Sequence, residues 1–407
     1  MTQYQITVDS ELLHQLFLGN TQDKGVALLL QSVLNQILKA QATEQLQAER
    51  YERTDQRLAY RNGYYPHTLS TRVGSITLRV PRFRDGSFST ELFARYQRSE
   101  QALVLALMEM VLNGVSTRKV TKITEELCGT EFSKSTVSEL CKQLDPIIAA
   151  WNSRSLHEQE YPFLIVDALY VKVREDGRVR SRGVMIAAGI NQHGYRELLG
   201  LRVDDTESEA SWRAFFAELK QRGLRGVDLV TSDQHGGLVK AVLQQFQGVT
   251  WQRCQTHFMR NILDVTPKAL REEVKAHVRA IFAAAKPETA RALLEQTINQ
   301  FQDSAPKAMK VLEEGFDDAT AVLAFPPECR KRIRTTNIME RLNNELRRRE
   351  RVIRIFPNRE SVFRLFGALL MDMDEKWAAQ KKYIELKDYQ ESKKAMKKET
   401  GKIVPIR

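Results

Sequence analysis

Cysteines are few in this sequence and long apolar runs are absent, which narrows the class of protein. The four cysteines (Cys128, Cys141, Cys254 and Cys329) are scattered among 407 residues without a CxxC pair. This spacing argues against a disulfide framework and favours a reducing compartment. Because no stretch of about 18 apolar residues occurs, we expect no membrane-spanning helix. The first residues lack a basic segment followed by an apolar run, so we expect no signal peptide and a cytoplasmic location.

Positive charge, in contrast, is in excess. The chain has 62 Lys and Arg residues against 51 Asp and Glu residues, a net charge of +11. A surplus of this size favours a polyanionic partner, most commonly nucleic acid, although a basic protein without such a partner would share it. Between Arg330 and Arg359 there are eleven Lys and Arg residues and three acids. The charge is therefore concentrated, as expected for a nucleic-acid footprint.

The N-terminal region, residues 1–58, is predicted to be helical. Apolar residues recur at helical spacing in the segment 10–58, which changes from an apolar half to a charged half. Dimerisation through this helix and simple packing in a core explain the pattern equally well.

A small basic β region is predicted at residues 59–99. Turn signals surround short alternating runs, and a strand is expected from Ser75 to Val80, ended by Pro81. Tyrosines and arginines alternate here, a composition that suits contacts with phosphates and bases, or else a solvated connector. The predicted DNA contacts in this region are Arg61, Arg72, Arg79 and Arg82.

A pair of short helices is predicted within residues 100–150. The first spans 116–127, Gly129 supplies a turn, and Ser133 caps a second helix over 135–144. This is the helix-turn-helix pattern, whose second helix enters the major groove of DNA, although many helical hairpins bind nothing. The predicted contacts on the second helix are Lys134, Ser135 and Thr136.

The segment 151–383 is predicted to form an α/β domain. Strands are expected at 163–173, 181–190, 196–203, 227–233 and 249–254. The first three form an antiparallel meander, and helices follow the third, fourth and fifth strands. This order is that of the ribonuclease-H-like fold, a mixed sheet. An all-helical insertion at about 257–328, helices at 336–350 and 359–383, and a frayed basic tail at 384–407 complete the prediction.

Two aspartates are expected to lie side by side in this sheet. Asp167 lies within an apolar strand, where a carboxylate costs several kcal/mol unless it is paired or binds a metal. Asp233 ends the fourth strand before a Gly-Gly pair, at the strand end where α/β sheets bind ligands. In the ribonuclease-H-like order the first and fourth strands are adjacent and parallel. A surface ion pair is the alternative explanation for Asp167.

A third carboxylate is predicted on the helix at 336–350. Glu340 and Glu345 are equally well placed by spacing, and ordinary helix ion pairs would explain both. Three carboxylates suit two Mg²⁺ ions about 3.5–4 Å apart, for which Mn²⁺ could substitute, because phosphodiester attack develops charge on the entering and leaving oxygens. The predicted DNA contacts on this helix are Arg341, Asn344, Arg347 and Arg348.

Around these carboxylates the chain resembles the mutator-type transposases of bacterial insertion sequences, over essentially its whole length. The resemblance rests on VDALYVKVR around Asp167, SDQHGGL around Asp233, WQRCQTHFMRNI at 251–262 and TTNIMERLNNELRRRERVIRIFPN at 335–358. Within the last motif, Asn337, Glu340, Arg341 and Asn343-Asn344 match the family pattern around its final catalytic glutamate. The resemblance therefore favours Glu340 over Glu345.

The resemblance implies an activity and partners. The N-terminal region would recognise the terminal inverted repeats of an insertion sequence in double-stranded DNA. Strand cleavage would free a 3′-hydroxyl, which is then joined to target DNA. Since two ends must be held together, at least a homodimer is expected on DNA, in association with the bacterial nucleoid. A non-catalytic DNA-binding repressor, which would lack a carboxylate, and a nuclease of the same fold are the alternatives.

Four residues near the predicted carboxylates are further candidates for a role at the site. Cys254 and His257 form the CxxH that the family carries after the fifth strand. Because a zinc site needs four ligands, we expect a structural or DNA-contact role for this pair. His235 and Asn337 are candidate neighbours of the active site, and His235 could equally cap a loop.

Overall fold

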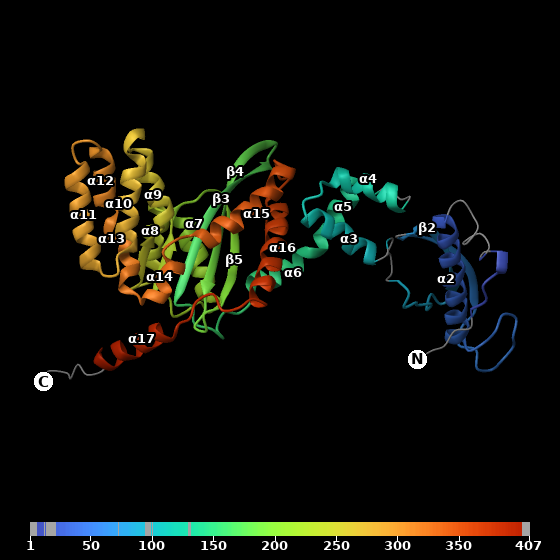
Figure 1. Ribbon diagram of the computed structural model, residues 1–407. Coiled ribbons are helices and arrows are strands. Elements are labelled where there is room, and N and C mark those ends of the chain that lie inside the picture. Colours follow the sequence, from blue (N-terminus) through green and yellow to red (C-terminus); the bar gives the residue numbers. More distant parts are fainter. Residues whose placement is uncertain are drawn as a thin grey trace. The chain divides into compact units, whose positions relative to one another are not determined.

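The computed structural model divides the chain into two compact units, Met1–Gln143 and Leu144–Arg407 (Figure 1). It describes residues 6–11, 13, 22–71, 73–93, 99, 101–128 and 132–400. Among these residues, no helix has both the length and the apolar character needed to cross a membrane.

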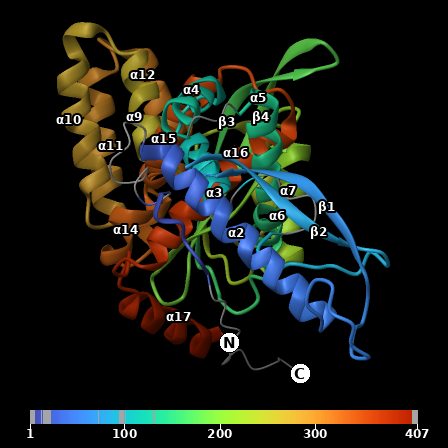
Figure 2. The same ribbon diagram turned by 90° about the vertical axis from the view of Figure 1, so that its right-hand side faces the viewer.

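In the first unit a helix packs against a two-stranded sheet. Strands β1 (Arg61–Thr71) and β2 (Gly74–Phe83) pair antiparallel, and α2 (Gln22–Leu46) lies along them (Figure 2). Residues 76, 78 and 80 alternate with exposed positions, so that their apolar side chains are buried beside Leu38 of α2. Burial of this alternating face holds the helix and the sheet together.

Helix α2 also covers the free edge of β2. The backbone N–H of Thr77 donates to the side-chain oxygen of Gln31 at 3.1 Å, and that of Arg79 donates to Asn35 at 2.7 Å. These N–H groups would otherwise be available for pairing with another strand.

Two predictions for this unit were wrong in part. The helix expected over 10–58 ends at Leu46, and Gln47 and Tyr51 beyond it have positive φ angles (49° and 67°) that interrupt a helix; residues 12 and 14–21 lie outside the described part. Strand β2 continues through Pro81, which pairs with Tyr64 beside a register shift. At such an irregularity on an outer strand, the missing N–H of proline is tolerated.

Three helices complete the first unit: α3 (Gln101–Leu112), α4 (Thr117–Cys128) and α5 (Lys134–Cys141). The predicted cap is confirmed, because Ser133 Oγ accepts the N–H of Thr136 at 3.1 Å at the start of α5. Val120 of α4 and Val137 of α5 are fully buried. The predicted turn glycine lies within residues 129–131, outside the described part.

The second unit contains a five-stranded mixed sheet. Its strands are β3 (Phe163–Glu175), β4 (Arg178–Ile190), β5 (Arg196–Asp204), β6 (Leu229–Ser232) and β7 (Thr250–Arg253). The spatial order is β5-β4-β3-β6-β7, with β3, β4 and β5 antiparallel and β6 and β7 parallel to β3. The predicted meander and the predicted parallel pairing of the first and fourth strands are both confirmed.

Helices cover both faces of this sheet. On one face, α7 (Glu209–Gln221) and α8 (Gly236–Gln245) bury Trp212 and two phenylalanines against the even-numbered side chains of β3. The other face is covered by α6 (Asp145–Ser153), α15 (Asn337–Ile353) and α16 (Arg359–Ala378). There Gly367 of α16 lies so close to Ile148 of α6 that a side chain would not fit.

The predicted helical insertion is confirmed between β7 and α15. It comprises α9 (Gln255–Asp264), α10 (Arg271–Ala283), α11 (Pro287–Phe301), α12 (Pro306–Glu314), α13 (Phe316–Thr320) and α14 (Pro327–Ile333). These helices bury their own apolar cluster, which includes Phe258, Val278 and Phe301.

The C-terminal segment differs from the frayed tail that we predicted. Residues Lys387–Thr400 form α17, and Tyr389 is only 7% exposed. Its ring lies 5.1 Å from that of Phe163, and its hydroxyl donates to Asp228. Lys393 also pairs with Asp228. One aromatic anchor and one shared carboxylate therefore dock a helix whose sequence is mostly polar.

We expect Tyr389→Ala to release α17 from the second unit. Loss of a buried aromatic side chain costs about 3 kcal/mol, which corresponds to more than tenfold faster local opening. Limited trypsin digestion, read by mass spectrometry, should show faster cleavage after Lys387 and Lys393. Tyr51, which is 86% exposed, provides the control Tyr51→Ala. Equal cleavage in both variants would contradict this docking.

Candidate active site

One row of side chains crosses the parallel strands β3, β6 and β7 and consists of Asp167, Asp233 and Cys254. Strand β3 pairs Ile165 with Thr231 of β6, and β6 pairs Ser232 with Arg253 of β7. Continued to the strand ends, both registers bring the three side chains to one level. The predicted pair of aspartates is thereby placed on adjacent strands, at the carboxyl ends of β6 and β7, where ligands of α/β sheets bind.

The carboxylate of Asp167 is held by two hydrogen bonds. The side-chain amide of Asn343 donates to Oδ2 at 2.8 Å, and the backbone N–H of Ala168 donates to Oδ1 at 2.9 Å. Burial, followed by the charge of Asp233, raises the pKa of Asp167 to about 7. Within the described part of the chain, no Lys or Arg forms an ion pair with either aspartate.

His257 links the row to Glu340. Its Nδ1 pairs with Asp233, and its Nε2 lies 3.9 Å from Oε1 of Glu340. Hydrogen bonds with Asp233 and Cys254 raise the pKa of His257 to about 10, so the imidazolium is the stable form at neutral pH. Arg260, one turn further along α9, lies 3.5 Å from the same Glu340 oxygen. Two cations thus keep Glu340 near Asp233.

Cys254 is fully buried at the junction of β7 and α15. The backbone N–H and the hydroxyl of Thr336 both donate to its sulfur at 3.3 Å. Burial raises the pKa of Cys254, but hydrogen bonds with His257 and Thr336 outweigh burial and lower it. Ligand atoms of Asp233, Cys254 and His257 lie within 4.8 Å of one another. The CxxH pair therefore contacts both the start of α15, through Thr336, and Asp233.

Helix α15 turns one stripe of side chains toward the row. Glu340, Asn343 and Arg347 are spaced i, i+3, i+7, and Arg347 donates to the carbonyl of Tyr170 in β3 at 2.7 Å. The sequence predicted Asn344 as a DNA contact and gave Asn343 no role of its own, whereas Asn343 contacts Asp167. Counting three residues from Glu340 instead of four would have found it.

Glu345, the sequence alternative to Glu340, forms ordinary helix ion pairs. Its carboxylate lies 2.9 Å from Arg348 and 3.1 Å from Arg349. These contacts satisfy Glu345 without any contribution from the sheet.

His235 caps α8, as one of its two interpretations predicted. Its Nδ1 accepts the N–H of Leu238 at 3.4 Å and lies 3.5 Å from Glu207. Glu207, which sequence analysis missed, also accepts a hydrogen bond from Trp212 at 3.2 Å. Its charge contributes to the raised pKa of Asp167.

The predicted DNA contacts of the first unit have different surroundings. Arg79 and Arg82 are exposed and lie over the rings of Tyr64 and Tyr65, at 5.2 and 4.9 Å. Arg61 is half-buried and donates to Thr43 and to the carbonyl of Ala48. The hydroxyls of Ser135 and Thr136 bond to Ser133, and Arg72 and the side chain of Lys134 lie outside the described part. All remain predictions.

The residues of α15 that were predicted to contact DNA also differ in their surroundings. Arg347 pairs with Glu350 at 2.7 Å, and Arg348 pairs with Glu345. Arg341 and Asn344 are exposed, and Asn337 accepts a hydrogen bond from Thr256 at 3.2 Å.

Comparison with known proteins gives consistent matches along the chain. A family model described as "Transposase, Mutator family" matches residues 1–380. The chain is 46% identical to the transposase for insertion sequence element IS256 in transposon Tn4001 of Staphylococcus aureus, over 94% of this chain and 99% of that protein. It is 42% identical to the transposase for element ISRM5 of Rhizobium meliloti (97% and 98%) and 38% identical to that for IS1081 of Mycobacterium tuberculosis (88% and 86%).

Proposed function

The chain belongs to the Mutator family of transposases, and from this premise we propose that it cuts and joins DNA at the ends of an insertion sequence. It would bind the terminal inverted repeats, cleave strands to free 3′-hydroxyl ends and transfer these ends to target DNA. The observation that carries the proposal is the gathering of Asp167, Asp233 and Glu340 around His257.

The carboxylates fit hard divalent cations. Burial and the charge of Asp233 raise the pKa of Asp167, and no described Lys or Arg side chain forms an ion pair with either aspartate. Carboxylate oxygens are the ligands that Mg²⁺ and Mn²⁺ prefer. Asp167, Asp233 and Glu340 would hold two such ions, which when bound would offset charge on the attacking and leaving oxygens.

The surrounding residues of the chain would prepare this site. Asn343 fixes the orientation of Asp167, and the imidazolium of His257 reduces repulsion between Asp233 and Glu340. Arg260 restrains Glu340 from the same side. Such restraint lowers the reorganisation needed when the site loads.

We further propose that the second unit has the ribonuclease-H-like fold, because its strand order and directions match that fold's. Helices α4 and α5 with their Ser133 cap would form a helix-turn-helix for the repeats. Because two ends must be brought together, a homodimer is the smallest assembly that we propose on DNA.

A strand-transfer assay tests the proposal. The substrate is a labelled duplex carrying the DNA that flanks the coding sequence, with a plasmid target. We expect joined products with Mg²⁺ and none with EDTA. Tight binding without cleavage would favour a DNA-binding repressor instead, and cleavage without preference for these ends would favour a nuclease.

Asn343→Ala is expected to raise the Mg²⁺ concentration required for half-maximal strand transfer by about 10- to 100-fold, a typical result of losing a residue that orients a metal ligand. Transfer should recover at high Mg²⁺. Asn344→Ala, the neighbouring exposed amide, should leave the Mg²⁺ requirement unchanged. Loss of transfer without recovery at any Mg²⁺ concentration would mean that Asn343 does not act through Asp167.

A further inference from the structure

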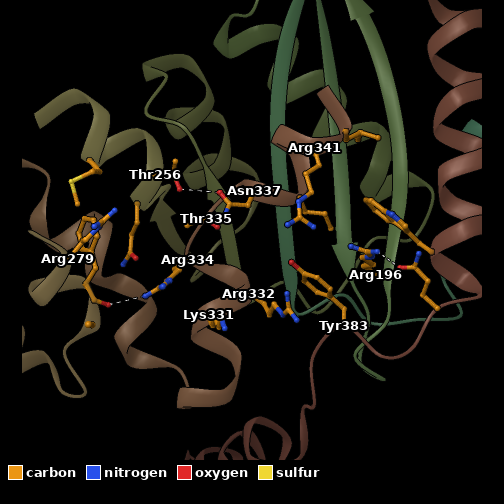
Figure 3. Close-up of a pocket in the computed structure, with 18 of the residues that line it drawn as sticks. Arg196, Thr256, Arg279, Lys331, Arg332, Arg334, Thr335, Asn337, Arg341 and Tyr383 are labelled. Atoms are coloured by element: carbon orange, nitrogen blue, oxygen red, sulfur yellow. Dashed lines mark hydrogen bonds between the residues drawn. The ribbon is translucent and has the colours of Figure 1, made fainter. Parts of the chain in front are cut away.

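A second polar site lies behind the start of α15. It is a cavity of about 1070 Å³, lined by α9, α10, α14, α15, α16 and the first residue of β5 (Figure 3). Its cations are Arg196, Arg279, Lys331, Arg332, Arg334 and Arg341. No carboxylate is among the lining residues, so the cavity carries a concentrated positive charge.

These six cations lack acidic partners within the described residues, because none of them forms an ion pair. The guanidinium of Arg334 donates to the carbonyl of Phe282, at 3.3 Å. Arg196 lies 4.4 Å over the ring of Trp377 and donates to Gln380 at 2.5 Å. Burial lowers the pKa of Arg196, and the charges of Arg332 and Arg341 lower it further. Such a cluster of uncompensated charges is expected to attract an anion.

The cavity and the carboxylates lie on two sides of the same helix starts. Thr256 lines the cavity and bonds to Asn337, while the next residue, His257, contacts Asp233. Likewise Asn337 and Arg341 line the cavity, while Glu340 between them faces His257. First-turn residues of α9 and α15 line the cavity, and neither N-cap residue caps its helix with a side chain.

The size of the cavity favours one nucleic-acid strand over a duplex. A volume of about 1070 Å³ is just above the range of about 300–1,000 Å³ that pockets for drug-sized molecules have, which suits a few nucleotides of one strand better than a duplex. Six cations exceed what one phosphate needs. The rings of Phe282, Trp377 and Tyr383 also line the space, and single-strand sites combine cations with aromatic rings in this way.

We propose that this cavity binds an unpaired segment of a DNA strand, through consecutive phosphates, on the side of α15 opposite the carboxylates. The inference rests on the proposed function, since it supposes that DNA reaches Glu340. It adds a site for one strand that is separate from the first-unit residues predicted to contact DNA, and it shares Arg341 with the predicted contacts on α15.

Salt-dependent binding tests the site in the full chain. Fluorescence anisotropy would follow a labelled oligo(dT) about 20 nucleotides long and a labelled blunt duplex, in EDTA so that no cleavage occurs. The variant Arg279→Gln/Lys331→Gln removes two exposed cavity cations. The variant Lys307→Gln/Lys310→Gln removes two exposed cations of α12 and serves as the matched control.

For the cavity variant we expect the slope of log K against log salt to fall by about 1.4 for oligo(dT), at roughly 0.7 for each lost phosphate contact. The duplex slope and the control variant should not change. An equal loss with duplex would overturn the proposal, as would an unchanged oligo(dT) slope. Displacement of oligo(dT) by inorganic pyrophosphate at constant ionic strength, from wild type but not from the variant, would instead indicate a site for small anions.

Photo-crosslinking provides a second readout. Oligo(dT) with 5-iodouracil substitutions should crosslink to Tyr383, Trp377 or Phe282, with lower yield in the cavity variant. Crosslinks confined to residues 1–143 would contradict the proposal. Failure of strand transfer together with cavity crosslinks would count against the proposed function alone. Strand transfer without cavity crosslinks would count against this inference alone.

Discussion

Replacing Glu340 with glutamine is expected to reduce strand transfer roughly a thousandfold or more, as loss of several kcal/mol of metal-dependent stabilisation implies. The substitution keeps the size of the side chain and removes one negative charge. Glu340 is the carboxylate of α15 that lies within reach of His257 and Arg260, beside Asp233. Binding to element ends should persist, because the change leaves the first unit intact.

The matched control is Glu345→Gln on the same helix. Glu345 is also acidic and one-third exposed, but its ion pairs are with Arg348 and Arg349. Those of Glu340 are with His257 and Arg260. We expect its transfer rate to stay within a few-fold of wild type, since exposed helix ion pairs contribute at most about 1 kcal/mol. Gel assays of joined products at matched protein concentrations would compare the two. Normal transfer by Glu340→Gln, with loss in Glu345→Gln, would reverse the assignment.

Trp212→Ala is expected to lower the free energy of unfolding of the second unit by about 3–5 kcal/mol, the usual cost of emptying a buried aromatic position. Trp212 is fully buried. Its ring stacks on Phe216 at 5.5 Å and lies 6.1 Å from Phe215. Urea unfolding followed by far-ultraviolet circular dichroism would measure the change. An unfolding midpoint equal to wild type would show that this core repacks without cost.

Trp212→Phe separates packing from the polar contact. Phenylalanine keeps an aromatic ring in the core but cannot donate to Glu207, as the indole does at 3.2 Å. We expect a stability loss below about 2 kcal/mol, since most of the buried volume remains. If the two variants were equally unstable, the hydrogen bond to Glu207 would be the larger contribution.

The sheet was predictable because its strands carry strong local signals. The run around Asp167 and the run ending at Asp233 are apolar and bounded by turns, and their parallel pairing followed from the order of elements. Residues 47–58 were predicted as helix because their composition is helix-compatible, yet Ala48 is the one buried apolar residue of this segment, and Tyr51 and Leu58 are exposed. For α17, docking depends on Tyr389 and Lys393, which share Asp228 as a partner, and periodicity cannot detect such isolated contacts.

The details of the site were less predictable, because they depend on contacts between distant segments. Asn343 and Asn344 are identical in type, and only the rotation of α15 against β3 decides which reaches Asp167. The bridging of Asp233 and Glu340 by His257 requires α9 and α15 to begin side by side. The basic cavity joins cations from Arg196 to Arg341, which no sequence window shows together.

The placement of Asn343 against Asp167 has a consequence for synthesis of the chain. These two side chains are 176 residues apart in sequence, and the whole helical insertion lies between them. Contacts of such long range form only after the intervening chain has closed into a loop, so they come late in folding. Because β3 is synthesised well before α15, a nascent chain can form the sheet before Asn343 and Glu340 have been synthesised. At that stage Asp167 lacks its amide partner. The proposed cleavage of DNA would thus become possible only once the chain is nearly complete, so that a partly synthesised chain would not cut DNA.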